Sequence, residues 1–382
     1  MRRNIRLKSL LILISMMIAL SACGIQSYSD TKGGKGPDYN TLTQTGSMEL
    51  KYAECFTVDK LGDYSLITIE DDKFLLVPEG VEPPSKVPGE VTILKQPLEN
   101  VYQVSSSIMD MIDEIDAMNH ITLTGTKESD WHIEAALSAM QSGKLTYAGK
   151  YSQPDYELLL SKNCSLAIEN TMILHNPETK EKLESLGIPV LIERSTYEPH
   201  PLGRLEWIKL YGLLFGKSDA ADSFYNDSLS KVEQVIQKER NGKSLAFFYV
   251  TSNGAVSVKK PNDYIARMVD LAGGVYLPDF LEEEEENAMS TINMTMEDFY
   301  ASTKDADILI YNATTVGDLS SLQDLLDKSP LFADYKAVKE GRVYMTGLNF
   351  FQKTTGACDL IEDMNKVLND ENEGLVFLQK LK

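Results

Sequence analysis

The stretch SLAIENTMILHNPETKEKLESLGIPVLIE, residues 165–193, decides the fold of this protein. Its first residues, SLAIEN (165–170), form a short apolar run that predicts a strand. PETKEKLESLG (177–187) predicts a helix, and IPVLIE (188–193) predicts a second strand. Short apolar strands that alternate with helices indicate a parallel, doubly wound sheet.

The same alternation extends from this stretch in both directions. On the N-terminal side we expect strands at VTIL (91–94) and HITLTG (120–125), and helices at residues 105–115, 132–143 and 156–163. Beyond residue 242 we expect strands at 244–250, 307–312 and 342–347, and helices at 261–274, 296–303 and 354–369. The sequence therefore predicts two α/β lobes: an N-lobe over residues 90–217 and a C-lobe over residues 242–382.

Residues 218–242, SDAADSFYNDSLSKVEQVIQKERNG, lie between the two lobes. Ala221, Tyr225, Leu229, Val232 and Ile236 fall on one face at helical spacing. A helix of about 22 residues would be about 33 Å long, which is enough to connect two lobes. The predicted fold class is thus α/β, with two doubly wound lobes joined by one long rigid helix over 218–241.

The N-terminus predicts export and lipid attachment. Four basic residues precede the apolar run LLILISMMIAL (10–20), which is too short to cross a bilayer, and small residues follow it. Leu-Ser-Ala-Cys at 20–23 matches the bacterial lipobox. We therefore expect a signal peptide over 1–22, a lipid on Cys23 and a location on the extracytoplasmic face of a bacterial cell membrane.

Two further segments separate the lipid from the lobes. Residues 23–45 are polar and rich in Gly, Ser and Thr, which predicts a flexible tether. Residues 46–89 contain short runs of strand-forming residues and close with a proline-rich piece, which predicts a small β-rich addition.

Charge and cysteine content exclude several classes of protein. The net charge of −20 argues against a nucleic-acid partner, because phosphate binding needs an excess of Lys and Arg. The remaining cysteines, Cys55, Cys164 and Cys358, are odd in number and match no zinc or redox spacing. One disulfide could form among them, but the sequence does not select a pair.

No pattern of residues predicts catalysis or a metal site. The four histidines are scattered and form neither an HxH nor an HExxH pattern. The chain also contains no GxSxG nucleophile elbow and no phosphate-binding GxxxxGK[ST] loop. We therefore predict that the protein is not an enzyme and has no intrinsic cofactor.

The loops beyond the carboxyl ends of the predicted strands are the expected ligand site, as in other open α/β sheets. They supply three aromatic side chains, one cation and several small polar groups, which suit a large, partly flat organic ligand better than a free ion. The alternative is that these residues lie on the surface or pack between the lobes. The candidates are Ser106, Trp131, Thr171, Arg194, Tyr197, Asn253, Asn349 and Phe350.

The segment EPHPLGRLEWIKLYGLLFG (198–216) also contains charged and aromatic residues, but most of it is not expected to contact a ligand. Apolar side chains cover so much of this segment that it predicts a well-buried helix from Pro201 to Gly216. Trp207 is then a core residue, and only the entry from Arg194 to His200 lies within reach of a ligand.

A weak internal repeat links the two lobes. Glu157 opens a predicted helix that leads to a strand ending near Asn170, and Glu297 opens one that leads to a strand ending near Asn312. Chance could also produce this similarity in a chain of repeated α/β units.

Three segments resemble one family. PETKEKLESLGIPV (177–190), PLGRLEWIKLYGLLFGK (201–217) and KAVKEGRVY (336–344) are similar to the substrate-binding proteins of ABC importers for iron-siderophore complexes, haem and cobalamin. The resemblance runs from about Glu90 to about Asn369 and does not include the β-rich addition.

The resemblance implies a monomeric receptor that binds one ligand between its lobes and delivers it to a dimeric ABC permease. It also implies that Glu157 and Glu297 dock onto permease arginines. The ligand would be a small-molecule metal chelate, with an iron complex (siderophore or haem) first and cobalamin or another corrinoid second. The chain shows no clear haem-ligating motif and no arginine cluster for a catecholate. A surface interaction protein that kept the fold is the remaining alternative.

Overall fold

The computed structural model of the protein describes residues 34–279, 291–315 and 317–382. The predicted signal peptide 1–22 and the predicted lipid site Cys23 lie outside these residues. Backbone contacts divide the described chain into two units, of which the smaller comprises residues 34–42 together with Glu82–Val91. The larger unit, Thr43–Val81 with Thr92–Lys382, contains both lobes.

In the smaller unit, residues 34–42 pair with residues 83–86. The short helix η1 (Tyr39–Thr41) is capped by Asp38, which also forms a parallel bridge with Ser85. The Asp38 carboxylate lies 2.5 Å from the Lys86 ammonium. These residues belong to the predicted tether 23–45, yet they have defined partners in the chain.

The β-rich addition forms a five-stranded sheet in the order β1-β2-β3-β4-β5. The first four strands, β1 (Gly46–Ser47), β2 (Thr57–Leu61), β3 (Tyr64–Ile69) and β4 (Asp72–Val77), are antiparallel. The last strand, β5 (Val91–Lys95), contains VTIL. The sequence predicts this strand but assigns it to the N-lobe, whereas it lies at the edge of the N-terminal sheet.

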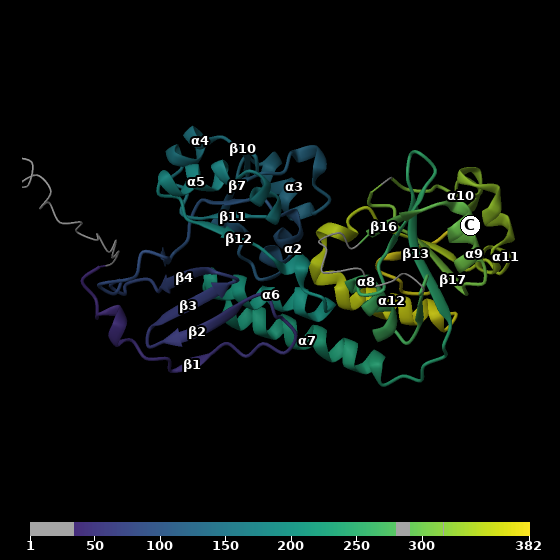
Figure 1. Cartoon of the computed structure of the whole chain (residues 1–382), viewed down its shortest axis with the longest axis horizontal. Coiled ribbons are helices and arrows are strands. Elements are labelled where there is room, and N and C mark those ends of the chain that lie inside the picture. Colours follow the sequence, from purple (N-terminus) through teal and green to yellow (C-terminus); the bar gives the residue numbers. More distant parts are fainter. Residues whose placement is uncertain (1–33, 280–290, 316) are drawn as a thin grey trace, which may run out of the picture. The chain divides into compact units, whose positions relative to one another are not determined.

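The N-lobe is built on a wholly parallel sheet, which confirms the predicted class (Figure 1). Its strand order is β12 (Val190–Ile192), β11 (Ala167–Glu169), β6 (Val101–Gln103), β7 (Ile121–Thr124) and β8 (Thr146–Tyr147). Its main helices are α2 (Ser106–Glu114), α3 (Glu134–Gln141), α4 (Tyr156–Ser161) and α5 (Pro177–Ser185). The chain leaves β6 toward β7 and later returns to β11 on the other side, so the strand order switches direction between β6 and β11.

The C-lobe sheet is mixed. Its central strand β13 (Ser244–Val250) pairs in parallel with β17 (Ile308–Tyr311), which in turn pairs in parallel with β18 (Val343–Thr346). On the other side, the first half of β13 pairs with β15 (Val275–Leu277) and its second half pairs with β14 (Val256–Lys259). The edge strands β16 (Thr291–Met294) and β19 (Leu378–Lys380) are antiparallel to their neighbours.

The helices of the C-lobe are short except for the last. They are α8 (Tyr264–Leu271), α9 (Met296–Thr303), α10 (Leu322–Lys328), α11 (Lys336–Lys339) and α12 (Ala357–Leu368).

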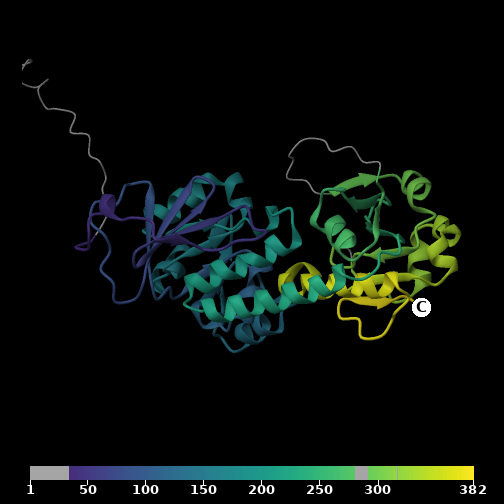
Figure 2. The same ribbon diagram turned by 90° about the horizontal axis from the view of Figure 1, so that it is seen from below.

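Two consecutive helices connect the lobes: α6 (Pro201–Leu214) and α7 (Ser218–Ile236). Gly216 ends α6 in the left-handed region, with φ of 68°. A Cβ on Gly212 would lie 2.6 Å from the Ala221 side chain, so glycine allows α6 and α7 to pack closely. Helix α7 runs along α6 and reaches α12, where Lys231 pairs with Asp359 at 3.0 Å (Figures 1 and 2).

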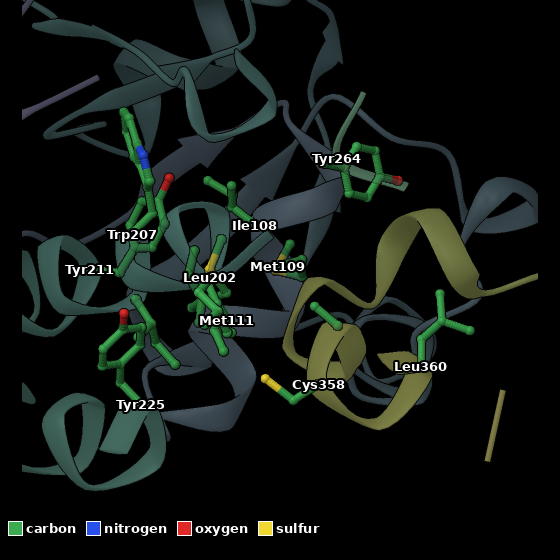
Figure 3. Close-up of a cluster of buried hydrophobic side chains, with 14 of the residues drawn as sticks. Ile108, Met109, Met111, Leu202, Trp207, Tyr211, Tyr225, Tyr264, Cys358 and Leu360 are labelled. Atoms are coloured by element: carbon green, nitrogen blue, oxygen red, sulfur yellow. The ribbon is translucent and has the colours of Figure 1, made fainter. Parts of the chain in front are cut away.

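Helix α6 is buried on nearly all sides, as its sequence predicts. Trp207 and Tyr211 have no exposed surface, and they lie with residues of α2 and α12 in one core cluster (Figure 3). The N-terminal sheet belongs to the same cluster, with Phe56 meeting the Trp207 ring edge-on at 4.8 Å between centroids. This sheet explains why one helix can be apolar on so much of its surface.

A candidate ligand cavity between the lobes

A cavity of about 720 Å³ is lined by residues of both lobes. This volume lies within the range of about 300–1,000 Å³ that is usual for small-molecule sites. The N-lobe contributes Ser107, Thr171, Met172, His175, Ser195, Thr196, Tyr197 and Arg204, and the C-lobe contributes Lys259, Tyr264, Met268, Phe350, Phe351, Lys353, Thr354 and Ala357.

The N-lobe wall lies where the direction of its strand order switches, which is the usual ligand position in an open parallel sheet. It consists of the start of α2, the turn η4 (Thr171–His175) after β11, and the turn η5 (Ser195–Tyr197) after β12. The Tyr197 hydroxyl donates to the Thr171 hydroxyl at 3.3 Å, which joins the two turns.

Two buried glutamates hold the segment around η5. Glu193, 1% exposed, accepts hydrogen bonds from the Ser195 N–H at 2.8 Å and from the Ser105 hydroxyl at 3.1 Å. Burial raises the pKa of Glu193, although these donors oppose that effect. Glu198, also 1% exposed, accepts the N–H groups of Glu54 and Cys55 and the indole N–H of Trp207 at 2.8–2.9 Å.

Three cations line the cavity: Arg204, Lys259 and Lys353. The Arg204 guanidinium donates to the carbonyls of Thr196 and Glu198 and lies 3.5 Å from the centre of the Tyr264 ring. The Lys259 ammonium lies 3.6 Å from Asp263, and burial lowers the pKa of Lys259. Among the described residues that line the cavity none is acidic, so the site favours an anionic ligand.

Aromatic and thioether side chains supply the apolar surface. Tyr197, Met172 and Phe351 remain 37–46% exposed at the cavity, whereas Phe350 is only 6% exposed. Phe350 packs on Phe351 with 5.0 Å between ring centroids, and it contacts Phe247 of the C-lobe core. These rings offer flat surfaces on which a planar ligand can stack.

The C-lobe wall is tied to the N-lobe across the rim. This wall is the segment Phe350–Gly356, which contains the turns η7 (Phe350–Gln352) and η8 (Thr354–Gly356). The Thr354 hydroxyl donates to the Ser107 carbonyl at 2.7 Å, and the Thr355 N–H donates to the Asp110 carboxylate at 2.9 Å. Gln352 exchanges two hydrogen bonds of 2.8 Å with Asp130 and His132.

Three of the predicted cleft residues, Thr171, Tyr197 and Phe350, line this cavity. Ser106 begins α2, but the next residue, Ser107, is the one at the cavity. The remaining four lie elsewhere.

Trp131 does not reach the cavity because it is 4% exposed and packs in the main core cluster. Arg194 is paired with Glu70 of the N-terminal sheet at 2.5 Å. Asn253 closes the turn after β13 by accepting the Ala255 N–H at 3.4 Å. Asn349 precedes η7, and it is the next two residues that line the cavity.

The sequence-based prediction missed all three cations at the cavity. Arg204 belongs to the helix that the sequence predicts to be buried, yet its guanidinium reaches out of the first helical turn to Tyr264. Lys259 ends β14 and Tyr264 begins α8, and neither follows one of the parallel strands to which the rule for open sheets applies. The helix-capping residue Asp263, four positions after Lys259, is the one local signal that could have directed attention there.

Glu157 and Glu297 have the same local setting. Each is exposed in the first turn of a helix whose N-terminus is capped, by Asp155 in α4 and by Thr295 in α9. Their carboxylates are therefore available to a partner, and the helix dipole favours their charge.

A second cavity of about 730 Å³ has a different character. Both of its arginines are already paired with a carboxylate, since Asp270 accepts from Arg240 at 2.7 Å and from Arg267 at 2.8 Å, and the acidic residues Glu54 and Asp279 also line it. We therefore regard the first cavity, whose lining residues include three cations and, among the described residues, no carboxylate, as the ligand site.

The described part of the chain contains no group of three or more His, Cys, Asp or Glu side chains that could hold a metal ion, and Cys55, Cys164 and Cys358 are free thiols there. None of the helices in residues 34–279, 291–315 and 317–382 combines the length and apolar character of a membrane span.

Comparison with known proteins agrees with this architecture. An uncharacterized lipoprotein of Methanocaldococcus jannaschii is 23% identical over 364 residues, covering 89% of each chain. A second uncharacterized lipoprotein of that organism is 22% identical and covers 82% of this chain and 74% of its own.

Solved structures share the fold at low identity. A periplasmic haem-binding protein of Pseudomonas aeruginosa superposes with a TM-score of 0.57 at 15% identity, covering 75% of this chain and 98% of that one. An ABC-type Fe3+-hydroxamate transport protein of Saccharomonospora viridis gives a TM-score of 0.54 at 19% identity, covering 70% and 92%.

The family model described as periplasmic binding protein matches residues 101–348, which is well over half of the chain. This match leaves out the N-terminal sheet, as the sequence resemblance does. The chain belongs to the periplasmic binding protein family, and its resemblance to the substrate-binding proteins of ABC importers is thereby confirmed.

Proposed function

We propose that this protein is an extracytoplasmic receptor that captures an anionic iron complex, a ferric siderophore or haem, and delivers it to an ABC permease. The observation that carries this proposal is the charge of the interlobe cavity. Arg204, Lys259 and Lys353 line it together with four aromatic rings, and none of the described residues that line it is acidic. Lys259 is paired with Asp263, which does not itself line the cavity.

The physical argument is one of charge and shape. Hydrogen bonds from Arg and Lys to a carboxylate or catecholate oxygen are stronger than neutral ones, and they strengthen further as the lobes exclude water. Aromatic side chains in the cavity wall can stack on a planar organic ligand, and stacking does not require a particular pattern of hydrogen bonds.

Haem and a ferric siderophore differ in which side chains of the cavity they would need. Haem would use the cations for its carboxylates, and the lining residues His175, Tyr197 and Met172 are of types that can ligate haem iron. A ferric siderophore needs only the charge and the apolar surface. Both fit the lining residues.

A corrinoid is the second candidate. Most of its side chains are neutral amides, so it would supply few anionic groups to the cations that line the cavity. A surface interaction protein that kept the fold would need neither the three cations nor the cavity.

Titration of the mature protein with three probes tests the proposal. Haemin, a ferric tricatecholate complex and cyanocobalamin are each followed by calorimetry and visible absorption. We expect saturable one-to-one binding of an anionic probe, and the variant Arg204→Gln should weaken it by about 10-fold or more. Binding of cyanocobalamin alone, or of none of the three, would contradict the proposal.

Delivery is proposed to depend on Cys23, Glu157 and Glu297. Cys23 would carry the lipid that keeps the monomeric receptor at the membrane, and the two glutamates would dock onto arginines of the permease dimer. We expect the double variant Glu157→Ala, Glu297→Ala to abolish uptake in cells while its ligand affinity stays unchanged. Normal uptake by this variant would refute the docking role.

A further inference from the structure

The N-terminal sheet lies outside the part of the chain matched by the family model, which begins at residue 101. Nevertheless, it makes two direct connections to the segment 193–198, which carries the η5 wall of the ligand cavity. The first connection is the ion pair of Glu70 with Arg194, and the second joins the Glu54 and Cys55 N–H groups to the Glu198 carboxylate.

Glu70 is placed for its role by the turn between β3 and β4. It adopts a left-handed conformation, with φ of 50°, and its carboxylate reaches the Arg194 guanidinium at 2.5 Å. Glu70 is half exposed, but the Arg194 side chain is only 14% exposed, so this carboxylate is the partner of a largely buried cation.

Arg194 in turn contacts a residue of the cavity wall. Its guanidinium lies 5.3 Å from the centre of the Tyr197 ring, within the range of a cation–π contact. The Tyr197 hydroxyl donates to Thr171, so a chain of contacts leads from Glu70 through Arg194 to two cavity residues. Neither Glu70 nor Arg194 lines the cavity itself.

We propose that the N-terminal sheet sets the position of the ligand wall, with Glu70 acting through Arg194 as a positioning residue for Tyr197. This inference rests on the proposed function, because it assumes that the cavity binds the ligand. Ligand affinity would then depend on a part of the chain that does not line the cavity.

The same turn of the sheet offers a matched control. Asp72, two residues after Glu70, pairs with Lys180 of α5 at 3.3 Å. Lys180 does not line the cavity. Glu70→Gln and Asp72→Asn therefore each remove one carboxylate charge from the same end of the β3–β4 hairpin, but only Glu70 is paired with a residue that contacts the wall.

Two measurements test the proposal on the full mature chain. Hydrogen–deuterium exchange compares the wild type with Glu70→Gln and Asp72→Asn in peptides that cover residues 194–198 and, separately, strands β2–β4. Calorimetric titration then measures the affinity of each protein for haemin and, in parallel, for a ferric tricatecholate complex.

We expect Glu70→Gln to raise exchange in 194–198 without raising it in β2–β4, and to weaken binding by about 3- to 10-fold. Asp72→Asn should change neither. The charge-swapped double variant Glu70→Arg, Arg194→Glu should bind more tightly than either single variant, which a general loss of stability would not produce.

Unchanged exchange in 194–198, or faster exchange with unchanged affinity, would overturn the positioning role. A wild-type protein that binds neither probe would instead contradict the proposed function, and the exchange data alone would then decide whether Glu70 holds the wall.

Discussion

The two walls of the ligand cavity are held in different ways. The η5 wall of the N-lobe is fixed from within its own side, by the buried carboxylates Glu193 and Glu198 and by the N-terminal sheet. The C-lobe wall, Phe350–Gly356, is tied by hydrogen bonds that cross to α2 and to residues 130–132 of the N-lobe. A separation of the lobes would break the second set of bonds and leave the first intact.

The two walls would therefore have different roles in ligand capture. A fixed wall keeps Tyr197 and Thr171 in place before the ligand arrives, which lowers the entropy lost on binding. The C-lobe wall, whose hydrogen bonds cross between the lobes, can move away with the C-lobe when the lobes separate. It can form those bonds again when the lobes close. Lobe movements of this kind usually rely on a few connecting residues.

The strongest test of the fixed wall removes one of its buried carboxylates. Glu198→Ala would leave three donors, on Glu54, Cys55 and Trp207, without their acceptor. We expect the free energy of unfolding to fall by about 3 kcal/mol, because buried unsatisfied groups are costly. Urea unfolding followed by tryptophan fluorescence measures this, since the Trp207 indole bonds to Glu198.

The control for that experiment is Glu181→Ala on the exposed face of α5, which should change stability by less than about 0.5 kcal/mol. Equal stability of the Glu198→Ala protein and wild type would mean that the wall is not fixed by this carboxylate.

A second test uses pH. Glu169 ends β11, directly before the segment that leads into Thr171, and burial raises its pKa to about 8. Because the folded pKa lies above the unfolded one, the contribution of this group to stability is full below about pH 4 and is lost as pH rises through 8. We expect a loss of about 3 kcal/mol between pH 5 and 8 from this residue.

Glu169→Leu should abolish that part of the pH dependence and be more stable than the wild type at pH 8. Neither oxygen of Glu169 has a hydrogen-bond partner in the described structure, so the apolar replacement breaks no bond. Parallel pH profiles of the two proteins would refute this assignment.

The smallest effect is expected at the C-lobe wall. Asp110, 7% exposed on α2, accepts the Thr355 N–H and hydroxyl across the lobes. Asp110→Ala should lower the free energy of unfolding by only about 1–2 kcal/mol, and it should raise hydrogen exchange in 350–356 while leaving 193–198 unchanged.

Asp113→Ala, on the exposed side of the same helix, is the matched control and should leave both segments as in the wild type. If Asp110→Ala loosened both walls equally, the distinction between a fixed and a movable wall would be lost.

Much of the fold could be predicted because its signals are local. Apolar runs at 165–170, 188–193 and 244–250 contain the strands β11, β12 and β13, and the wide apolar surface of 201–214 predicts the buried helix α6. The three-residue strand β6 escaped prediction because VYQ is too short to show a period. The strand at 91–95 was predicted, but which sheet it joins depends on long-range pairing.

The candidate site was only partly predictable. The rule for open sheets found Thr171 and Tyr197 because they follow parallel strands. It selected Arg194 over Arg204 because the sequence cannot show that Glu70 occupies the first guanidinium and that the second extends toward Tyr264.

The sequence by itself determined the alternation of the main strands and helices in both lobes, the family and the acidic character of the chain, since these depend on residue type and local spacing. Only the tertiary structure decided which charges meet the ligand and which are already paired. Residues as distant in the chain as Glu70 and Arg194, or Arg204 and Lys259, come together through packing of whole elements, and no local pattern records that packing.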